Sequence, residues 1–253
     1  MFFDTHCHFN AEAFRIRLPE TLQAAYELDV TRFLNISAAH EDWPDLAQIA
    51  RTYENITPAF GIHPLFLPTS ALNIESSLPT LLQAFPYAAI GEIGLDFYHH
   101  PDLIEKNRQE EFFARQIAVA HAAQRPIVLH QRKAHEQCLA MLKAYQFTRG
   151  GFAHAFSGSL EQAKQWLDMG FVIGVGTVLL HPAARKLPEV LRYLPADGWV
   201  LESDAPFMMT GNQPSVVAKI AQTAAAVRGE TVAEIARQTT ANALRILYGN
   251  HSA

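Results

Sequence analysis

Short apolar segments and longer amphipathic segments alternate along this chain of 253 residues. Eight short segments are rich in apolar or β-branched residues, and successive segments begin about 20 to 40 residues apart. Runs of this length and character are typical of strands in a parallel sheet that is covered on both faces. The predicted strands span residues 2–5, 32–37, 56–61, 88–91, 126–129, 151–153, 171–175 and 199–201.

The longer segments carry apolar residues at helical spacing and charged residues on the other side. Phe113, Ile117 and Ala120 belong to such an apolar stripe within residues 105–124. Ser159 is followed three residues later by Gln162, which is the pattern of a capping box at the start of a helix. The predicted helices span residues 42–53, 75–85, 105–124, 135–145, 159–169, 183–194 and 231–247.

Eight strands with helices between them, in a chain of this length, predict an α/β fold of the (β/α)8 TIM-barrel type. An open, doubly wound parallel sheet is the alternative. No low-complexity segment, charge run or Pro/Ser-rich linker divides the sequence. We therefore expect residues 1–253 to form a single domain.

The composition limits the kinds of molecule that the protein is expected to bind. Twenty basic residues against 25 acidic ones give a net charge of −5, which excludes the broad cationic face of a general nucleic-acid coat. A local phosphate site remains open, because bound metal ions would bring their own positive charge. The uncharged run at residues 169–184 is 16 residues long and is broken by Gly and Pro, whereas a transmembrane helix needs about 20 apolar residues.

The cysteines and the first residues of the chain bear on its compartment. Cys7 and Cys138 are the two cysteines, too few for a disulfide framework. No basic segment followed by an apolar stretch, as in a signal peptide, is visible at the start. We therefore expect a cytoplasmic protein with no membrane contact and no obligate protein partner.

His6 and His8 give the first indication of chemistry. Side chains two residues apart on a strand point to the same face, so both imidazoles can reach one cation. Taken alone, such a pair is more often two polar residues at a strand end than a metal site.

Four more ionisable residues stand at the ends of other predicted strands: Glu92, His130, His154 and Asp204. The carboxyl ends of barrel strands converge on one face, where active sites are built. A single histidine in such a place is commonly a structural hydrogen-bonding residue. Five strands that contribute only His, Glu and Asp at this end indicate a metal site instead.

Six ligands are too many for one tetrahedral ion and suit two divalent cations. The simplest assignment places His6, His8 and Asp204 on one metal and His130 and His154 on the other, with Glu92 as the bridge. Three histidines on one ion and one on the other is the alternative. The donor set suits zinc, manganese, iron or nickel, and magnesium less well. Glu92 and Asp204 are then the catalytic carboxylates, and Asp204 is placed to accept a proton from a metal-activated water.

Three further residues each have two possible roles. Glu202 shares strand-face parity with Asp204, so it either orients a histidine ligand or forms a salt bridge inside the barrel. His63 also ends a strand segment and either binds substrate or has a structural role. Arg132, two residues after His130, either clamps an anionic oxygen of the substrate or forms a surface ion pair.

At these residues the chain resembles the TatD family of metal-dependent hydrolases, within the amidohydrolase-like barrels, and most closely its YjjV-like subgroup. The motifs that carry the resemblance run in family order: residues 4–8, 61–64, 91–96, 129–132, 154–158 and 202–206. The resemblance implies a (β/α)8 barrel, a two-metal site and hydrolysis of ester bonds, and several family members are DNases. It also implies the ligand set given above, with Glu92 as the bridging carboxylate.

Two departures from the family pattern bear on the substrate. DNase-type members usually carry a basic residue and Asn-Glu-Pro after the Asp-Ala-Pro motif, whereas residues 209–214 are Met-Thr-Gly-Asn-Gln-Pro here, without a charge. Leu65 stands where many members have another histidine. Both changes imply a weaker grip on phosphate.

The sequence therefore predicts a binuclear metal-dependent hydrolase of ester bonds. A phosphodiester in a small or single-stranded nucleic acid is the favoured substrate, because tight duplex binding depends on many cationic contacts. An amide, lactone or acyl ester is the first alternative. A barrel that binds metal without catalysis is the second.

Overall fold

The structure is a computed structural model, and it describes residues 1–70, 72–98 and 100–249. Eight strands form one sheet in which each strand pairs in parallel with the next along the chain. The strands are β1 (Phe2–Cys7), β2 (Val30–Ile36), β3 (Ile56–Phe60), β4 (Ala89–Asp96), β5 (Ile127–Arg132), β6 (Gly151–Ala153), β7 (Phe171–Val175) and β8 (Trp199–Leu201). The order confirms the predicted barrel and excludes the doubly wound sheet, whose strand order reverses.

Strands β8 and β1 close the barrel through a few specific bonds rather than a regular ladder. The Thr5 hydroxyl donates to the carbonyl oxygen of Leu201 over 2.9 Å. Further along, Cys7 and Ala205 form an isolated parallel bridge. The closure therefore brings the end of β1 beside the residues that follow β8.

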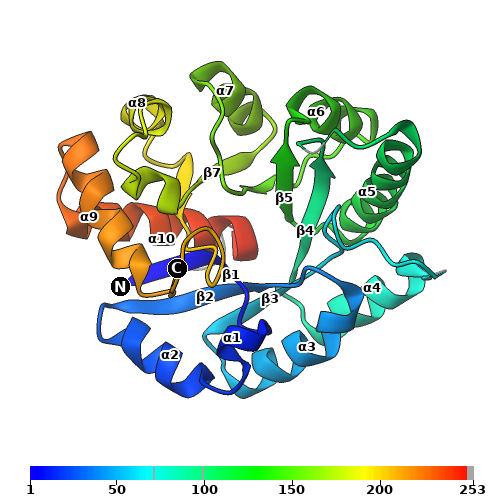
Figure 1. Ribbon diagram of the computed structural model, residues 1–253, viewed down its shortest axis with the longest axis horizontal. Coiled ribbons are helices and arrows are strands. Elements are labelled where there is room, and N and C mark those ends of the chain that lie inside the picture. Colours follow the sequence, from blue (N-terminus) through cyan, green and yellow to red (C-terminus); the bar gives the residue numbers. More distant parts are fainter. Residues whose placement is uncertain (71, 99, 250–253) are drawn as a thin grey trace.

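The helices surround the strands in chain order, as Figure 1 shows for α2 to α9. They are α1 (Glu12–Arg15), α2 (Leu18–Tyr26), α3 (Trp43–Thr52), α4 (Ile74–Ala84), α5 (Leu103–Ala123), α6 (His135–Ala144), α7 (Leu160–Asp168), α8 (Lys186–Tyr193), α9 (Val216–Arg228) and α10 (Val232–Tyr248), with short 3-10 helices at η1 (His40–Asp42) and η2 (Thr177–Leu180). In the described part of the chain, none of these helices has the length and apolar character needed to cross a membrane. The capping box predicted at Ser159 and Gln162 is confirmed, because each side chain accepts a hydrogen bond from the backbone N–H of the other residue.

One end of the barrel is filled by side chains and covered by α10. Each of the eight strands sends at least one side chain into the same apolar cluster, among them Phe3 of β1 and Phe152 of β6. Ala243, Ile246 and Leu247 of α10 belong to that cluster. Because α10 also bonds to segments just before strands, the helix covers the amino-terminal end of the barrel, with Thr240 bonded to the Met1 carbonyl and Asn242 to the carbonyls of Ala196 and Trp199. The carboxyl end is thereby left for the polar residues.

Candidate metal centre

The structure brings the six predicted ligands together at the carboxyl end of the barrel. His6, Glu92 and His130 lie within β1, β4 and β5, and His8, His154 and Asp204 follow β1, β6 and β8. Glu92 and His130 were expected to follow their strands, but β4 and β5 continue past them to Asp96 and Arg132. All six side chains are largely buried, and the most exposed are His130 and Asp204, at 16% and 14%.

One carboxylate oxygen of Glu92 faces a first group of donors. Its Oε2 lies 3.2 Å from Nε2 of His6. Nε2 of His8 is 3.1 Å from Nε2 of His6, and Oδ1 of Asp204 is 3.4 Å from Nε2 of His8. Four side chains from three parts of the chain therefore direct nitrogen or oxygen atoms at one small volume.

The other oxygen of Glu92 faces a second group. Its Oε1 lies 2.6 Å from Nδ1 of His130 and 3.9 Å from Nε2 of His154. His63 belongs to this group as well, because its Nε2 lies 3.7 Å from the same oxygen and 3.0 Å from Nδ1 of His130. Asp204 touches both groups, since its Oδ2 is 3.5 Å from Nε2 of His154.

The charges of this cluster favour ionised carboxylates among imidazoles. Burial alone would raise the pKa of Glu92, but the imidazoles of His154 and His6 outweigh it and hold that pKa well below its usual range. Burial likewise opposes ionisation of Asp204, and His154 and His8 overcome it, so the pKa of Asp204 is also strongly lowered. Burial, helped by neighbouring His130, lowers the pKa of His63 to about 3, so this imidazole is neutral near pH 7 and keeps a lone pair.

His8 and His130 are oriented by hydrogen-bond partners outside the cluster. Nδ1 of His8 is 3.0 Å from the carbonyl oxygen of Ile36, which leaves Nε2 facing the first group. Nε2 of His130 is 3.0 Å from Oδ2 of Asp96, which leaves Nδ1 facing the second. In the sequence, Asp96 is part of the motif at residues 91–96 and has no predicted role of its own. Its even spacing from Glu92 on one strand, which places both on the same face, is the sequence signal that could have revealed it.

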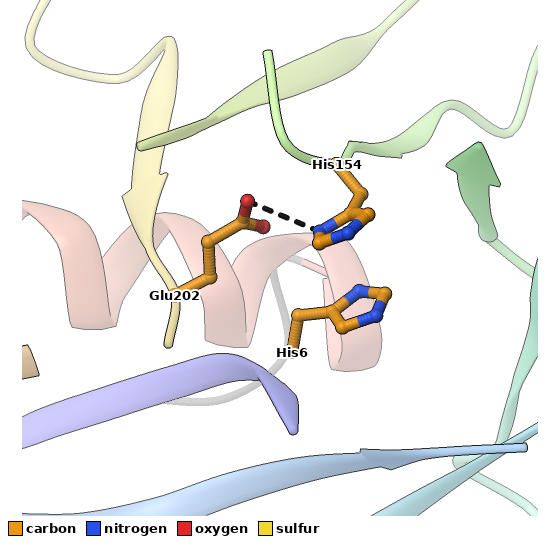
Figure 2. A group of neighbouring side chains, drawn as sticks. All are labelled: His6, His154 and Glu202. Carbon is orange, nitrogen blue, oxygen red and sulfur yellow. Dashed lines mark ion pairs between the residues drawn. The ribbon is translucent and has the colours of Figure 1, made fainter. Parts of the chain in front are cut away.

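Glu202 lies to one side of the His154 and His6 rings, with its carboxylate directed at His154 (Figure 2). Its Oε1 is 3.1 Å from Nδ1 of His154 and accepts a hydrogen bond from the Ala155 amide over 2.7 Å. The His6 and His154 rings stack, with centroids 3.4 Å apart. The geometry is that of a carboxylate that orients a histidine, one of the two roles considered for Glu202. Space for it comes from Gly174 of β7, where a Cβ would overlap the carboxylate.

A buried network fixes the segment that carries Asp204. The Ser203 amide and hydroxyl donate to the two carboxylate oxygens of Asp4, over 2.9 and 2.6 Å. Asn212 donates from its side chain to the carbonyl oxygen of Ser203 over 2.8 Å. Burial raises the pKa of Asp4 to about 8, although the bonds from Ser203 work in the opposite direction. Asp204 itself adopts φ 54°, a strained value that this network holds in place.

Arg132 lies outside the cluster, at the exposed end of β5. Its guanidinium sits 3.6 Å from the centroid of the Tyr98 ring. Both residues line an open pocket of about 740 Å³, together with Lys133, Lys186 and Ser157. Three cations and the acidic Glu136 line this cavity, which is formed by segments that follow β4, β5 and β6 and by the start of α8.

The donor set fits divalent cations. Two candidate groups share Glu92, one with His6 and His8 and the other with His63 and His130, and the ligand atoms within each lie within 4.8 Å of one another. Buried imidazole nitrogens and carboxylate oxygens that converge in this way are the usual ligands of zinc and related metals. Nδ1 of His6 and one oxygen of Glu202 are buried without a hydrogen-bond partner, as expected of groups arranged around something more than the protein alone.

A TIM barrel with such a donor set at the carboxyl end of its strands defines a metal-dependent hydrolase by class. Residues 3–248 match the family of TatD related DNases, and the chain belongs to this family. It is 32% identical, over 93% of both chains, to a protein of Escherichia coli (strain K12) named "Uncharacterized metal-dependent hydrolase YjjV". The crystal structure of YjjV from E. coli K12 superimposes with a TM-score of 0.87 over 97% of each chain. A protein of Klebsiella pneumoniae (strain 342), named "3'-5' ssDNA/RNA exonuclease TatD", is 31% identical over 80% of both chains.

Proposed function

We propose that this chain is a single-domain phosphodiesterase that uses two divalent cations to hydrolyse single-stranded nucleic acids or smaller phosphodiesters. The observation that carries the proposal is that Glu92 lies between the two groups of donor side chains. One of its oxygens faces His6, and the other faces His130. A carboxylate in this position is suited to bridge two ions about 3.5–4 Å apart, the spacing used by two-metal phosphodiesterases.

The remaining ligands follow from this division. His6, His8 and Asp204 would hold the first cation, and His130 and His154 the second. His63 was expected to bind substrate, but its nitrogen lies close enough to Glu92 and His130 to serve as a ligand of the second cation instead. Zinc, manganese, iron and nickel suit these donors, and magnesium suits them less well.

Asp204 is the residue best placed to move a proton. It touches both donor groups, and at 14% its side chain is more exposed than that of Glu92, at 5%. Bound cations would supply positive charge to the phosphate oxygens and lower the pKa of water, which makes a nucleophile available near neutral pH. The Asp204 carboxylate would accept the proton of the attacking water, and Glu92 would fix the distance between the two halves of the site.

Arg132 and its pocket are suited to the rest of the substrate. Arg132, Lys133 and Lys186 line a cavity beside the cluster, where they would pair with a phosphate next to the one being cleaved. The exonuclease name of the Klebsiella relative supports a nucleic-acid substrate, since 80% of each chain aligns with the other. The net charge of −5 favours a single strand over a duplex.

The test is the substitution Glu92→Gln, which keeps the shape of the side chain and removes the charge. We expect metal analysis to give two ions per chain for the wild type and fewer for the variant. We expect hydrolysis to fall by more than the ~10–100-fold typical of residues that only orient a ligand. Glu189→Gln, on the exposed surface of α8, is the matched control and should keep both ions and full activity.

A substrate panel separates the alternatives. It contains a single-stranded oligonucleotide, the same sequence as a duplex, bis-p-nitrophenyl phosphate and p-nitrophenyl acyl esters. Cleavage of the single strand supports the proposal. Turnover of acyl esters alone would assign the site to carbonyl chemistry, and two bound ions without any turnover would make the barrel a metal-binding protein. Full activity of Glu92→Gln would contradict the bridging role.

A further inference from the structure

Two exposed phenyl rings stand beside the metal centre. Phe207, after β8, is 52% exposed, and Phe66, after β3, is 55% exposed. The Phe207 ring packs edge-on against His8, with centroids 5.1 Å apart, and the Phe66 ring packs in the same way against His63, at 5.6 Å. Each donor group therefore has a large apolar ring next to it that remains open to solvent.

The backbone holds both rings in place. The Phe207 amide donates to the carbonyl of Asp204 over 2.7 Å, and its own carbonyl accepts from the buried side chain of Asn212 over 2.7 Å. The Phe66 amide donates to the carbonyl of His63 over 2.9 Å. Each ring is thus on a turn that begins at a residue of the cluster. A ring positioned in advance loses little conformational entropy when it meets a ligand.

Exposed rings in this arrangement imply a planar, apolar partner. Single exposed apolar residues are common on protein surfaces, but these two rings flank the candidate metal ligands rather than a remote surface. A phosphodiester at Glu92 would extend its two substituents to either side, one toward His8 and the other toward His63. The cationic pocket of Arg132, Lys133 and Lys186 adds a place for a further phosphate. Flat apolar groups joined by phosphates are the chemistry of nucleotides.

We propose that Phe66 and Phe207 are stacking platforms for the nucleobases on the two sides of the scissile phosphodiester. The inference rests on the proposed function and deepens it. Since every base presents a π-face and neither phenyl ring offers a hydrogen bond, such platforms bind single strands with little regard to sequence. They also require unpaired bases, because bases inside a duplex are already stacked on one another.

The experiment compares a single-stranded oligonucleotide with one whose terminal nucleotides are replaced by abasic analogues. Wild-type kcat/KM should be higher for the base-bearing strand by about 5- to 100-fold, the range that base–aromatic stacking supplies. Phe207→Ala and Phe66→Ala should each lose most of this preference, measured within each variant as the ratio of kcat/KM for the base-bearing strand to kcat/KM for the abasic strand. Phe207→Trp should retain it, whereas Phe207→Leu, which is apolar but not planar, should not.

Tyr193→Ala is the control, because Tyr193 is a 68% exposed aromatic residue at the far end of α8, near the start of β8. It should leave both rates unchanged. Binding is measured separately, with 2-aminopurine at the terminal position and metal chelated by EDTA. Its fluorescence should be quenched by the wild type and much less by Phe207→Ala.

Equal wild-type rates on both strands, or full preference in Phe207→Leu, would overturn the stacking role while leaving the phosphodiesterase intact. Failure of the wild type to cleave either strand would instead overturn the proposed function and the inference with it. The two failures are therefore distinguishable in one set of assays.

Discussion

At the residue scale, the orientation of three of the imidazoles depends on the partner of the second ring nitrogen. The three partners differ: a backbone carbonyl for His8, Asp96 for His130 and Glu202 for His154. A carboxylate partner raises the basicity of the ring as well as fixing its angle. Asp96 is suited to this because the hydrogen bond from His130 helps to keep its pKa below the usual value against the effect of burial.

Asp96→Asn tests whether this carboxylate supports the second cation. The Tyr98 amide donates to Oδ1 of Asp96 over 3.0 Å, and an asparagine retains that acceptor, so the turn after β4 should survive. The charge that faces Nε2 of His130 is lost. We expect metal affinity to fall by about 10–100-fold, measured by competition with a chromophoric chelator.

The thermal unfolding temperature of the metal-free variant serves as the control for this substitution. It should stay close to that of the metal-free wild type if Asp96 acts through His130. A variant that binds metal as tightly as the wild type would show that the 3.0 Å contact has no influence on the site. A metal-free variant that unfolds at a much lower temperature than the metal-free wild type would assign Asp96 a structural role instead.

The placement of His, Glu and Asp at the ends of predicted strands was enough to predict the six residues that converge, because the carboxyl ends of barrel strands meet at one face. Contacts between side chains of neighbouring strands could not be predicted from the sequence. Gly174 and Gly176 have no predicted role in the sequence. The fold explains these two glycines. Strand β7 pairs with β8, and the Glu202 side chain occupies the space that side chains at positions 174 and 176 would need. The side chain of Asn212 likewise reaches Ser203 only through the fold.

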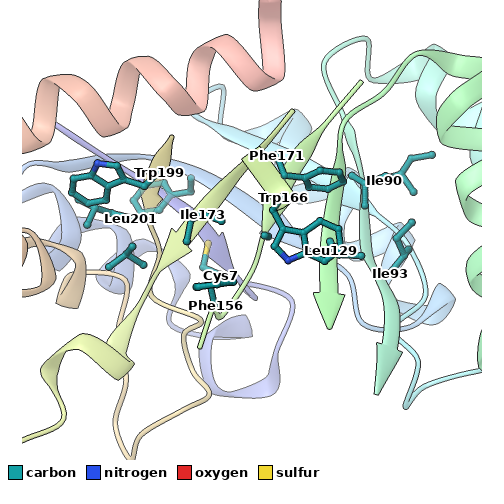
Figure 3. Close-up of a cluster of buried hydrophobic side chains, with 14 of the residues drawn as sticks. Cys7, Ile90, Ile93, Leu129, Phe156, Trp166, Phe171, Ile173, Trp199 and Leu201 are labelled. Atoms are coloured by element: carbon teal, nitrogen blue, oxygen red, sulfur yellow. The ribbon is translucent and has the colours of Figure 1, made fainter. Parts of the chain in front are cut away.

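At the element scale, burial decided which segments were predictable. Strands β6, β7 and β8 match their predicted bounds because they are short, apolar and fully buried. Figure 3 shows residues of β7 and β8 in the core, with Phe171 of β7 beside Trp166 of α7, at a centroid distance of 5.6 Å. Strands β4 and β5 run further than predicted because their last residues are polar yet still pair with one another. Helix α9 was not predicted, since alanines make up much of its buried face.

Helices α4 and α5 are joined by an ion pair whose contribution depends on pH. Arg115 donates from Nε and Nη2 to the two carboxylate oxygens of Glu75, over 2.6 and 2.8 Å. The bond from Arg115 lowers the pKa of Glu75 to about 2, from an ordinary value of 4.5. A depressed carboxyl pKa contributes stability that is fully present above pH 4.5 and is lost as the pH falls through 2.

Glu75→Gln should therefore destabilise the protein near pH 7, and the difference from the wild type should shrink as the pH drops from 5 toward 3. The Glu75 side chain is 52% exposed, so we expect less than about 1 kcal/mol, measured by urea unfolding at several pH values. Glu111→Gln is the control, because Glu111 contacts the same guanidinium at 3.9 Å and is 66% exposed. It should cost less and vary less with pH. A constant difference for Glu75→Gln at all pH values would contradict the ionic origin.

At the scale of the whole molecule, the two ends of the barrel have separate tasks. The amino-terminal end is filled by apolar side chains and covered by α10, with Tyr248 bonded to Thr57 near the start of β3. The carboxyl end carries the cluster and the loops that border it. The apolar cluster and the candidate ligands therefore lie at opposite ends of the strands. Stability and metal binding should consequently respond to different substitutions.

Ile246→Ala tests this separation. Ile246 is 3% exposed and packs in the cluster with side chains from all eight strands. Its truncation should leave a cavity that costs about 2–5 kcal/mol in the free energy of unfolding, measured with urea. Metal content and kcat/KM at 25 °C should stay within about twofold of the wild type, a change equivalent to only ~0.4 kcal/mol. Val232→Ala, at the 37% exposed start of the same helix, should cost little in either measurement. Loss of metal in folded Ile246→Ala would show instead that α10 controls the geometry of the site through the length of the barrel.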